Sequence, residues 1–195
     1  MRLILGLLTG AWGRMHAQRP VAIAQAPKGR VITVRGVAVP RDLLDSPLSG
    51  TPCVYYRYSV EEWRKSRLLG AGASAGFWQL AEHDEAIVEF YVDDGTARAI
   101  VAPGDARIRA PRRLDNAATD AARPGAGLAL GLERRARELL IEPGDELTVT
   151  GHAVDVADLF DEGRSYRAAP QRLMLRAPAA ATLDIRILRK RAPGA

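Results

Sequence analysis

Cys53-Val54-Tyr55-Tyr56-Arg57-Tyr58-Ser59-Val60 is the stretch that decides the fold class. β-branched and aromatic residues fill it, and such residues favour an extended backbone, so it predicts the clearest strand of the chain. Working outward, other apolar runs predict further strands at residues 87–92, 97–101, 146–156, 171–175 and 182–188.

Upstream of this stretch, apolar and polar residues alternate along residues 31–39. Ile32 and Val34 follow one phase of the alternation. Val37 and Val39 follow the other phase. The change of phase falls at Gly36 and predicts a β-bulge there, which would re-aim the strand.

Turn signals separate the predicted strands. The sequence Asp93-Asp94-Gly95-Thr96 predicts a short hairpin, with a glycine available for a positive φ. Two Pro-Gly-Asp sequences, at residues 103–105 and 143–145, place proline and glycine where a type II turn requires them. Residues 46–52, rich in serine and proline, predict a rigid connector.

One region departs from the strand pattern. Residues 109–131 are rich in Ala, Arg, Gly and Pro and predict a long loop. The apolar stripe that follows, Leu132, Ala136, Leu139 and Leu140, predicts a short helix. Because strands and helices do not alternate, we expect a β-rich α+β fold. We expect a single small barrel- or sandwich-like domain of about seven strands with one or two helices.

Composition excludes several functional classes. Among the 195 residues there is one cysteine, Cys53, and there are three histidines. This set is too small for an internal disulfide framework or for a zinc finger of normal spacing. The net charge of +5 keeps a nucleic-acid-binding β-barrel as the main alternative function. Acids are interspersed among the basic residues, and basic residues do not alternate with aromatic ones, which disfavours base stacking.

The N-terminus carries the most apolar segment of the chain. On a helix, one face would hold Leu3, Ile4, Leu7, Leu8 and Trp12. The segment is about half as long as a bilayer-spanning helix requires. We therefore expect residues 1–19 to form a helix that docks on the core, on a partner or on a membrane surface.

One catalytic motif matches literally. Residues 72–76 read G-x-S-x-G with Ser74 at the centre, and His152 lies downstream. In hydrolases this serine occupies a strained turn from a strand to a helix in an α/β sheet. Here the motif lies in a glycine- and alanine-rich stretch with no α/β alternation. A serine hydrolase using Ser74 is therefore a remote alternative.

Metal and thiol chemistry are also disfavoured. His83 and its acidic neighbours (residues 82–85) predict an exposed turn before a strand rather than a metal site. Asp93 and Asp94 predict a hairpin turn, because the ligand series of an EF-hand is missing. Cys53 lies in the strongest strand and is typical of a buried, inert thiol. We expect no catalytic residue, no metal and no cofactor.

Several short motifs occur in a fixed order along residues 20–178. They are Ala26-Pro27-Lys28-Gly29-Arg30-Val31, Arg35-Gly36-Val37, the long segment Leu44 to Tyr56, Phe90-Tyr91-Val92-Asp93-Asp94-Gly95-Thr96-Ala97, and Glu142-Pro143-Gly144-Asp145-Glu146-Leu147 through Gly151. In this order they resemble the bacterial members of the GIDE family. These are "beside a membrane" domains related to the non-RING part of the mitochondrial membrane E3 ubiquitin ligase.

The resemblance picks out a set of motif residues with a structural or interaction role. They are Gly36, Pro47, Leu48, Gly50, Cys53, Tyr55, Tyr56, Asp93, Asp94, Gly95, Gly144, Asp145 and Gly151. It implies a GIDE-like domain over residues 20–189, followed by a basic tail at 190–195. Ubiquitin-ligase activity does not carry over, because the chain has no RING ligands.

What the resemblance implies is a membrane-proximal sensing or scaffolding module. We expect a non-enzymatic binding protein of the cytoplasm, attached peripherally to the inner membrane. The expected partner is a protein, either soluble or embedded in the membrane. Nucleic acid is disfavoured as a partner. The oligomeric state is left open.

Overall fold

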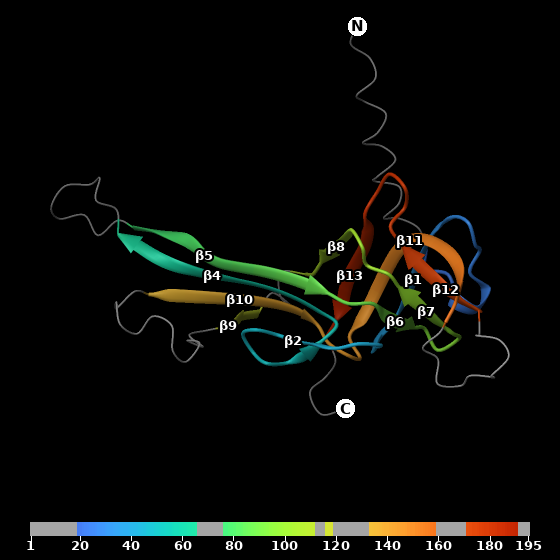
Figure 1. Cartoon of the computed structure of the whole chain (residues 1–195), viewed down its shortest axis with the longest axis horizontal. Coiled ribbons are helices and arrows are strands. Elements are labelled where there is room, and N and C mark those ends of the chain that lie inside the picture. Colours follow the sequence, from blue (N-terminus) through green and yellow to red (C-terminus); the bar gives the residue numbers. More distant parts are fainter. Residues whose placement is uncertain (1–18, 66–75, 112–115, 119–132, 159–170, 191–195) are drawn as a thin grey trace, which may run out of the picture.

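The computed structural model describes residues 19–65, 76–111, 116–118, 133–158 and 171–190. Strands dominate these ranges and form a barrel with a long arm projecting from it (Figure 1). Within the same ranges the helical structure is one short 3-10 turn, η1 (Ile23–Gln25). The prediction of a β-rich domain built on a small barrel is therefore confirmed.

The barrel closes through five strands: β1 (Val31–Pro40), β6 (Phe90–Asp93), β7 (Arg98–Val101), β12 (Gln171–Arg176) and β11 (Glu146–Ala157). Neighbours run antiparallel except β7 and β12, which are parallel. Closure occurs at β1, which bonds β6 along one edge and β11 along the other. Val37 is opposite Asp93 on one side and Glu146 on the other.

Two more strands extend this sheet. β11 also bonds β13 (Leu183–Arg189) in antiparallel fashion, and β13 bonds β8 (Ala106–Arg109) in parallel. The barrel sheet therefore has seven strands in the order β1-β6-β7-β12-β11-β13-β8, which is the number that the sequence predicts for the whole chain. The strands outside this sheet lie in two insertions, one between β1 and β6 and the other between β7 and β11.

Those insertions build the arm. Its sheet has the order β5-β4-β10-β9, from β4 (Tyr55–Lys65), β5 (Gly76–Ile87), β9 (Asn116–Ala118) and β10 (Arg134–Ile141). β4 and β5 run together as a long hairpin whose outer end lies far from the barrel (Figure 1). A small hairpin of β2 (Leu44–Asp45) and β3 (Pro52–Cys53) lies near the base of the arm.

One continuous hydrophobic cluster fills the barrel and reaches the base of the arm. Inside the barrel it includes Val34, Phe90 and Ile185, and it continues to Tyr55 and Ile141 on the arm strands. Because burial of apolar surface is the main favourable term in folding, this shared core ties the arm to the barrel.

The bulge predicted at Gly36 is absent from the described β1, whose register with β11 is continuous from Val31 to Val37. Ile32, Val34 and Ala38 are all buried, so the alternation keeps one phase along the strand. The prediction is wrong because Val37 is an apolar residue on the outer surface, where its side chain is 40% exposed.

The helix predicted from Leu132 to Leu140 is also wrong, because residues 134–141 form β10. Leu139 and Ile141 alternate into the core, while Glu138 lies on the opposite face and contacts Ser46. Because both faces of β10 are partly covered, its apolar residues do not follow the strict alternation of a half-exposed strand. Their spacing therefore resembles that of a helix.

Three smaller expectations are corrected as well. Residues 82–85 belong to β5 rather than to a turn. The run 87–92 is divided, because β5 ends at Ile87 and β6 begins at Phe90, where the chain returns from the arm to the barrel. Strand β9 falls within the predicted loop 109–131. Residues 112–115 and 119–131 lie outside the described residues.

No helix in the described ranges is long and apolar enough to cross a bilayer. The apolar N-terminal face of Leu3, Ile4, Leu7, Leu8 and Trp12 lies outside the described residues.

Candidate functional site

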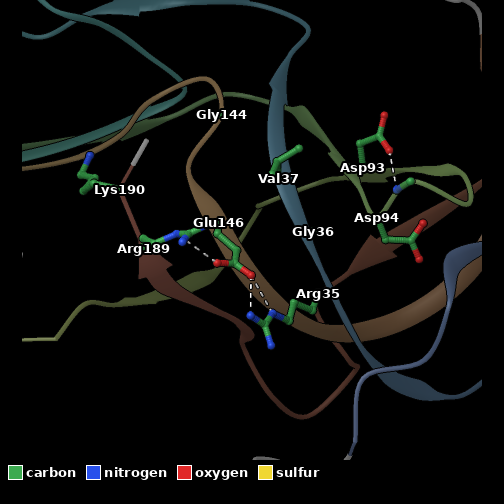
Figure 2. A pocket seen from close by; sticks show the side chains of 10 residues that line it. Arg35, Gly36, Val37, Asp93, Asp94, Gly144, Glu146, Arg189 and Lys190 are labelled. Atoms are coloured by element: carbon green, nitrogen blue, oxygen red, sulfur yellow. Dashed lines mark hydrogen bonds and ion pairs between the residues drawn. The ribbon is translucent and has the colours of Figure 1, made fainter. Parts of the chain in front are cut away.

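Five of the motif residues come together at one place on the barrel. Gly36, Asp93, Asp94, Gly95 and Gly144 line an open groove of about 790 Å³. The remaining lining residues are Arg35, Val37, Glu146, Arg189 and Lys190 (Figure 2). β1 runs through the groove, and the ends of β6, β11 and β13 flank it.

The floor of the groove depends on the absence of a side chain at Gly36. A Cβ atom built at this position would lie 2.3 Å from the carbonyl oxygen of Asp93 and 3.0 Å from the backbone nitrogen of Asp94. Real Cβ atoms do not approach backbone atoms this closely. Gly36 thus lets β1 contact the start of the hairpin between β6 and β7.

That hairpin is organised by its two aspartates. Asp93 accepts a hydrogen bond from the backbone N–H of Gly95 (2.8 Å) and one from Arg98 (2.8 Å). The Arg98 guanidinium and then the Gly95 N–H lower the pKa of Asp93 below its ordinary value. Gly95 has a φ of +82°, the left-handed conformation that the predicted hairpin requires.

Asp94 holds the hairpin together and ties it to the N-terminal part of the domain. Its Oδ1 accepts bonds from the N–H groups of Thr96 (2.8 Å) and Ala97 (3.0 Å), and its Oδ2 accepts one from Ile23 of η1 (2.7 Å). Burial acts to raise the pKa of Asp94, but these hydrogen bonds outweigh burial and lower it. Both carboxylate oxygens of Asp94 thus accept hydrogen bonds from backbone N–H groups, and a hard cation would have to compete with these bonds.

The turn at residues 143–145 forms another wall. Asp145 is buried, and its Oδ2 accepts bonds from the Glu142 N–H (2.9 Å) and from Nζ of Lys190 (2.9 Å). Lys190 also donates to the carbonyl oxygen of Leu140 (2.9 Å). Although the sequence places Lys190 in a basic tail, its ammonium group anchors the end of β13 to the turn before β11.

Three charged side chains, two exposed arginines and a partly buried glutamate, cross the outer rim. Arg35 donates from Nε and Nη2 to Oε1 of Glu146 (2.8 and 2.5 Å), while Nε of Arg189 lies 3.6 Å from Oε2. Figure 2 shows Glu146 between the two arginines, with Val37 beside them. Two guanidinium groups face one carboxylate, and the Arg189 side chain is 81% exposed, so this rim carries excess positive charge.

The other motif residues build backbone geometry elsewhere. Pro47, Leu48 and Gly50 lie in the loop that joins β2 to β3, where Gly50 has a φ of +67° and donates its N–H to the carbonyl of Ser46 (2.8 Å). On β11, a Cβ atom at Gly151 would lie 2.4 Å from the Leu183 side chain. These residues do not line the groove.

Cys53, Tyr55 and Tyr56 lie at the base of the arm. Cys53 is fully buried, as predicted, and burial raises the pKa of its thiol to about 11, with the Glu138 carboxylate adding to the effect. The hydroxyl of Tyr55 donates to Glu85 (2.8 Å). The hydroxyl of Tyr56 donates to Asp84 (2.9 Å), and this bond raises the pKa of Tyr56.

Of the residues considered for catalysis, the two described histidines, His83 and His152, lie on strands of different sheets. Ser74 lies outside the described residues, in the connection between β4 and β5, which are antiparallel neighbours. His152 lies on β11, in the barrel. His83 lies on β5, with Nδ1 2.9 Å from the carbonyl oxygen of Tyr58. In the described part of the chain, no group of three His, Cys, Asp or Glu residues is placed to hold a metal ion.

Sequence reasoning misses the charged rim. Arg35 and Glu146 are more than a hundred residues apart, and only the β1–β11 pairing brings them together. The sequence contains one signal for the rim. If the alternation of residues 31–39 keeps a single phase, Val37 is an exposed apolar residue. No protein-family model, curated protein or solved structure matches this chain.

Proposed function

We propose that this protein is a non-catalytic binding or scaffolding module that holds a protein partner in the barrel groove, next to a membrane. One observation carries the proposal. The carboxylates of Asp93, Asp94 and Asp145 all accept hydrogen bonds from backbone N–H groups, and Asp93 and Asp145 are also paired with Arg98 and Lys190. By contrast, Arg35, Val37 and Arg189 remain exposed on the rim. The resemblance to GIDE domains supports the membrane-proximal setting.

The chemistry of the groove favours binding over catalysis. General acids, bases and nucleophiles act through groups that converge with pKa values shifted toward the working pH. In the groove, Asp93 and Asp94 have pKa values lowered by their hydrogen bonds, so both remain ionised at neutral pH. The pKa of Cys53 is raised to about 11, away from that of an active thiolate.

The rim indicates what kind of segment the groove would accept. Val37 offers an apolar surface beside two arginines, Arg35 and Arg189, that share one carboxylate, Glu146 (Figure 2). An extended segment of a partner protein with an apolar side chain and an acidic neighbour would complement both features.

A photo-crosslinking experiment tests this proposal. A photoreactive amino acid replaces Val37 in the full chain in cells, and the matched control places it at Gln171, an exposed residue outside the groove. We expect one discrete protein adduct from position 37, lost on Arg189→Glu and absent from position 171. Identical adducts from both positions, or none from position 37, would contradict the proposal.

Nucleic-acid binding is supported less well. Five-stranded barrels of the OB type bind oligonucleotides on the face of their second and third strands. The corresponding strands here are β6 and β7, and on their outer face Tyr91 is 8% exposed and Ile100 is 2% exposed. We expect oligonucleotide binding to be weak and to vanish at physiological salt, as diffuse charge predicts. Submicromolar affinity at that salt would reverse this ranking.

A further inference from the structure

The outer end of the arm carries large apolar side chains on both faces of the sheet. Phe77 is 55% exposed and Leu80 is 58% exposed. Phe77 is opposite Arg64 in the β4–β5 register, whereas Trp78, the next residue along β5, is opposite Trp63. Because successive side chains of a strand point to opposite faces, Phe77 lies on one face, and Trp78 and Leu80 lie on the other.

The two tryptophans form a rigid aromatic pair. The rings of Trp63 and Trp78 meet edge to face, with centroids 5.3 Å apart. The guanidinium of Arg135 lies over the Trp78 ring, 4.4 Å from its centroid, and donates to Glu61 (2.6 Å). An aromatic pair with an arginine stacked on it combines apolar area with fixed positive charge.

Arginines also neutralise a second acid at this end. Glu62 is paired with Arg64 (2.7 Å) and with Arg134. The described residues at this end also include Lys65 and Glu133, so four basic residues lie near three acids and the local charge is slightly positive.

Charge is segregated along β5. Its first six residues, 76–81, contain no acid, whereas residues 82–85 contain Glu82, Asp84 and Glu85. The sequence between β4 and β5 also contains no acidic residue. The acids of β5 thus lie on the side of this strand that runs toward the barrel (Figure 1). On β4, Glu61 and Glu62 lie opposite Leu80 and Gln79, and both are paired with arginines.

We propose that the outer end of the arm docks on an anionic lipid surface, with Phe77, Trp78 and Leu80 entering the boundary between headgroups and acyl chains. Tryptophan favours this boundary, and clustered arginines attract anionic headgroups. This proposal rests on the proposed membrane-proximal function and names the element that makes the contact.

A lipid surface fits the exposed residues of the hairpin better than a protein or a nucleic acid does. A flat protein or a nucleic-acid strand would cover one face of the hairpin and leave Phe77 or Leu80 in water. A lipid interface surrounds the inserted end and buries both residues. The acids of β5 lie on the barrel side of the inserted residues, and arginines compensate Glu61 and Glu62 of β4, so the end carries no uncompensated acid of these two strands toward an anionic surface.

The test uses the full chain with Trp12→Phe, so that emission reports only on Trp63 and Trp78, the remaining tryptophans. Vesicles contain phosphatidylcholine alone or with about one third phosphatidylglycerol. We expect a blue shift and quenching by brominated acyl chains with the anionic vesicles only. The double variant Phe77→Ser/Leu80→Ser should weaken vesicle binding by about tenfold or more.

The matched control is Leu43→Ser, an exposed apolar residue outside both the groove and the outer end of the arm, which should leave vesicle binding unchanged. Because Phe77 and Leu80 are exposed, the double variant should keep its thermal unfolding midpoint and its crosslinking from position 37. Vesicle binding without a change in tryptophan emission would overturn the arm proposal and leave the groove proposal standing. Equal binding of the double variant would overturn it too, as would submicromolar binding of a labelled oligonucleotide that the double variant loses.

Discussion

A Cβ atom at Gly36 would lie 2.3 Å from the carbonyl oxygen of Asp93, so these two residues set the spacing between β1 and the β6–β7 hairpin. The contact explains a glycine in the middle of a strand, where glycine ordinarily lowers stability.

Gly36→Ala should destabilise the domain by about 3 kcal/mol, because the neighbouring atoms are backbone and cannot rotate away. Denaturant unfolding of the purified protein measures this change. Val37→Ala, at the adjacent exposed position, is the control and should change stability by less than about 1 kcal/mol. A Gly36→Ala protein as stable as the parent would show that β1 and the hairpin are not in tight contact.

The stability of the hairpin should depend on pH through Asp93. Its pKa in the folded state is lowered from the ordinary value of 3.8, chiefly by Arg98. A lowered folded pKa contributes stability above the unfolded pKa, and this contribution disappears as the pH falls through the folded value. In denaturant unfolding, Asp93→Asn should therefore cost about 1 kcal/mol near neutral pH and much less at a pH below the lowered pKa of Asp93. A cost that is equal at both pH values would contradict this assignment.

Lys190 should contribute more to stability than its neighbour in the chain, Arg189. Its ammonium group bonds Asp145, Glu142 and the Leu140 carbonyl, each at 2.9 Å, and its side chain is mostly buried. Lys190→Met should cost about 2 kcal/mol, because the buried Asp145 carboxylate loses its cation. Arg189→Met should cost less than about 0.5 kcal/mol. If the two substitutions lowered the thermal unfolding midpoint equally, Lys190 would behave as part of a free tail, contrary to this prediction.

Cys53 should resist alkylation. Its side chain is fully buried, and its pKa of about 11 leaves little thiolate near pH 8. We expect iodoacetamide labelling, followed by mass spectrometry, to be slow in the folded protein and fast in denaturant. Rapid labelling of the folded protein would indicate an accessible, activated thiol instead.

The sequence predicts strands well where apolar residues alternate with polar ones or where β-branched residues cluster. β4, β11, β12 and β13 all begin within a few residues of their predicted starts. It fails at β10, because Glu138 contacts Ser46 on one face while Leu139 enters the core on the other, so burial does not follow one phase.

The groove illustrates a second limit. The local turn chemistry of Asp93, Gly95 and Gly144 can be read from neighbouring residues. The meeting of Arg35, Glu146 and Arg189 cannot, because it depends on the pairing of β1 and β13 with the same end of β11. The charged rim is therefore a property of topology rather than of any local motif.

The central claim is that function depends on binding in the groove and not on catalysis, and complementation of cells that require the protein tests it most directly. Ser74→Ala, Cys53→Ala and His152→Ala, introduced separately, should support full growth. Val37→Asp/Arg189→Glu, which changes the exposed rim, should abolish growth while the protein remains folded and abundant. Full growth of the rim variant, together with loss of growth on Ser74→Ala in a folded protein, would contradict the account and favour a hydrolase.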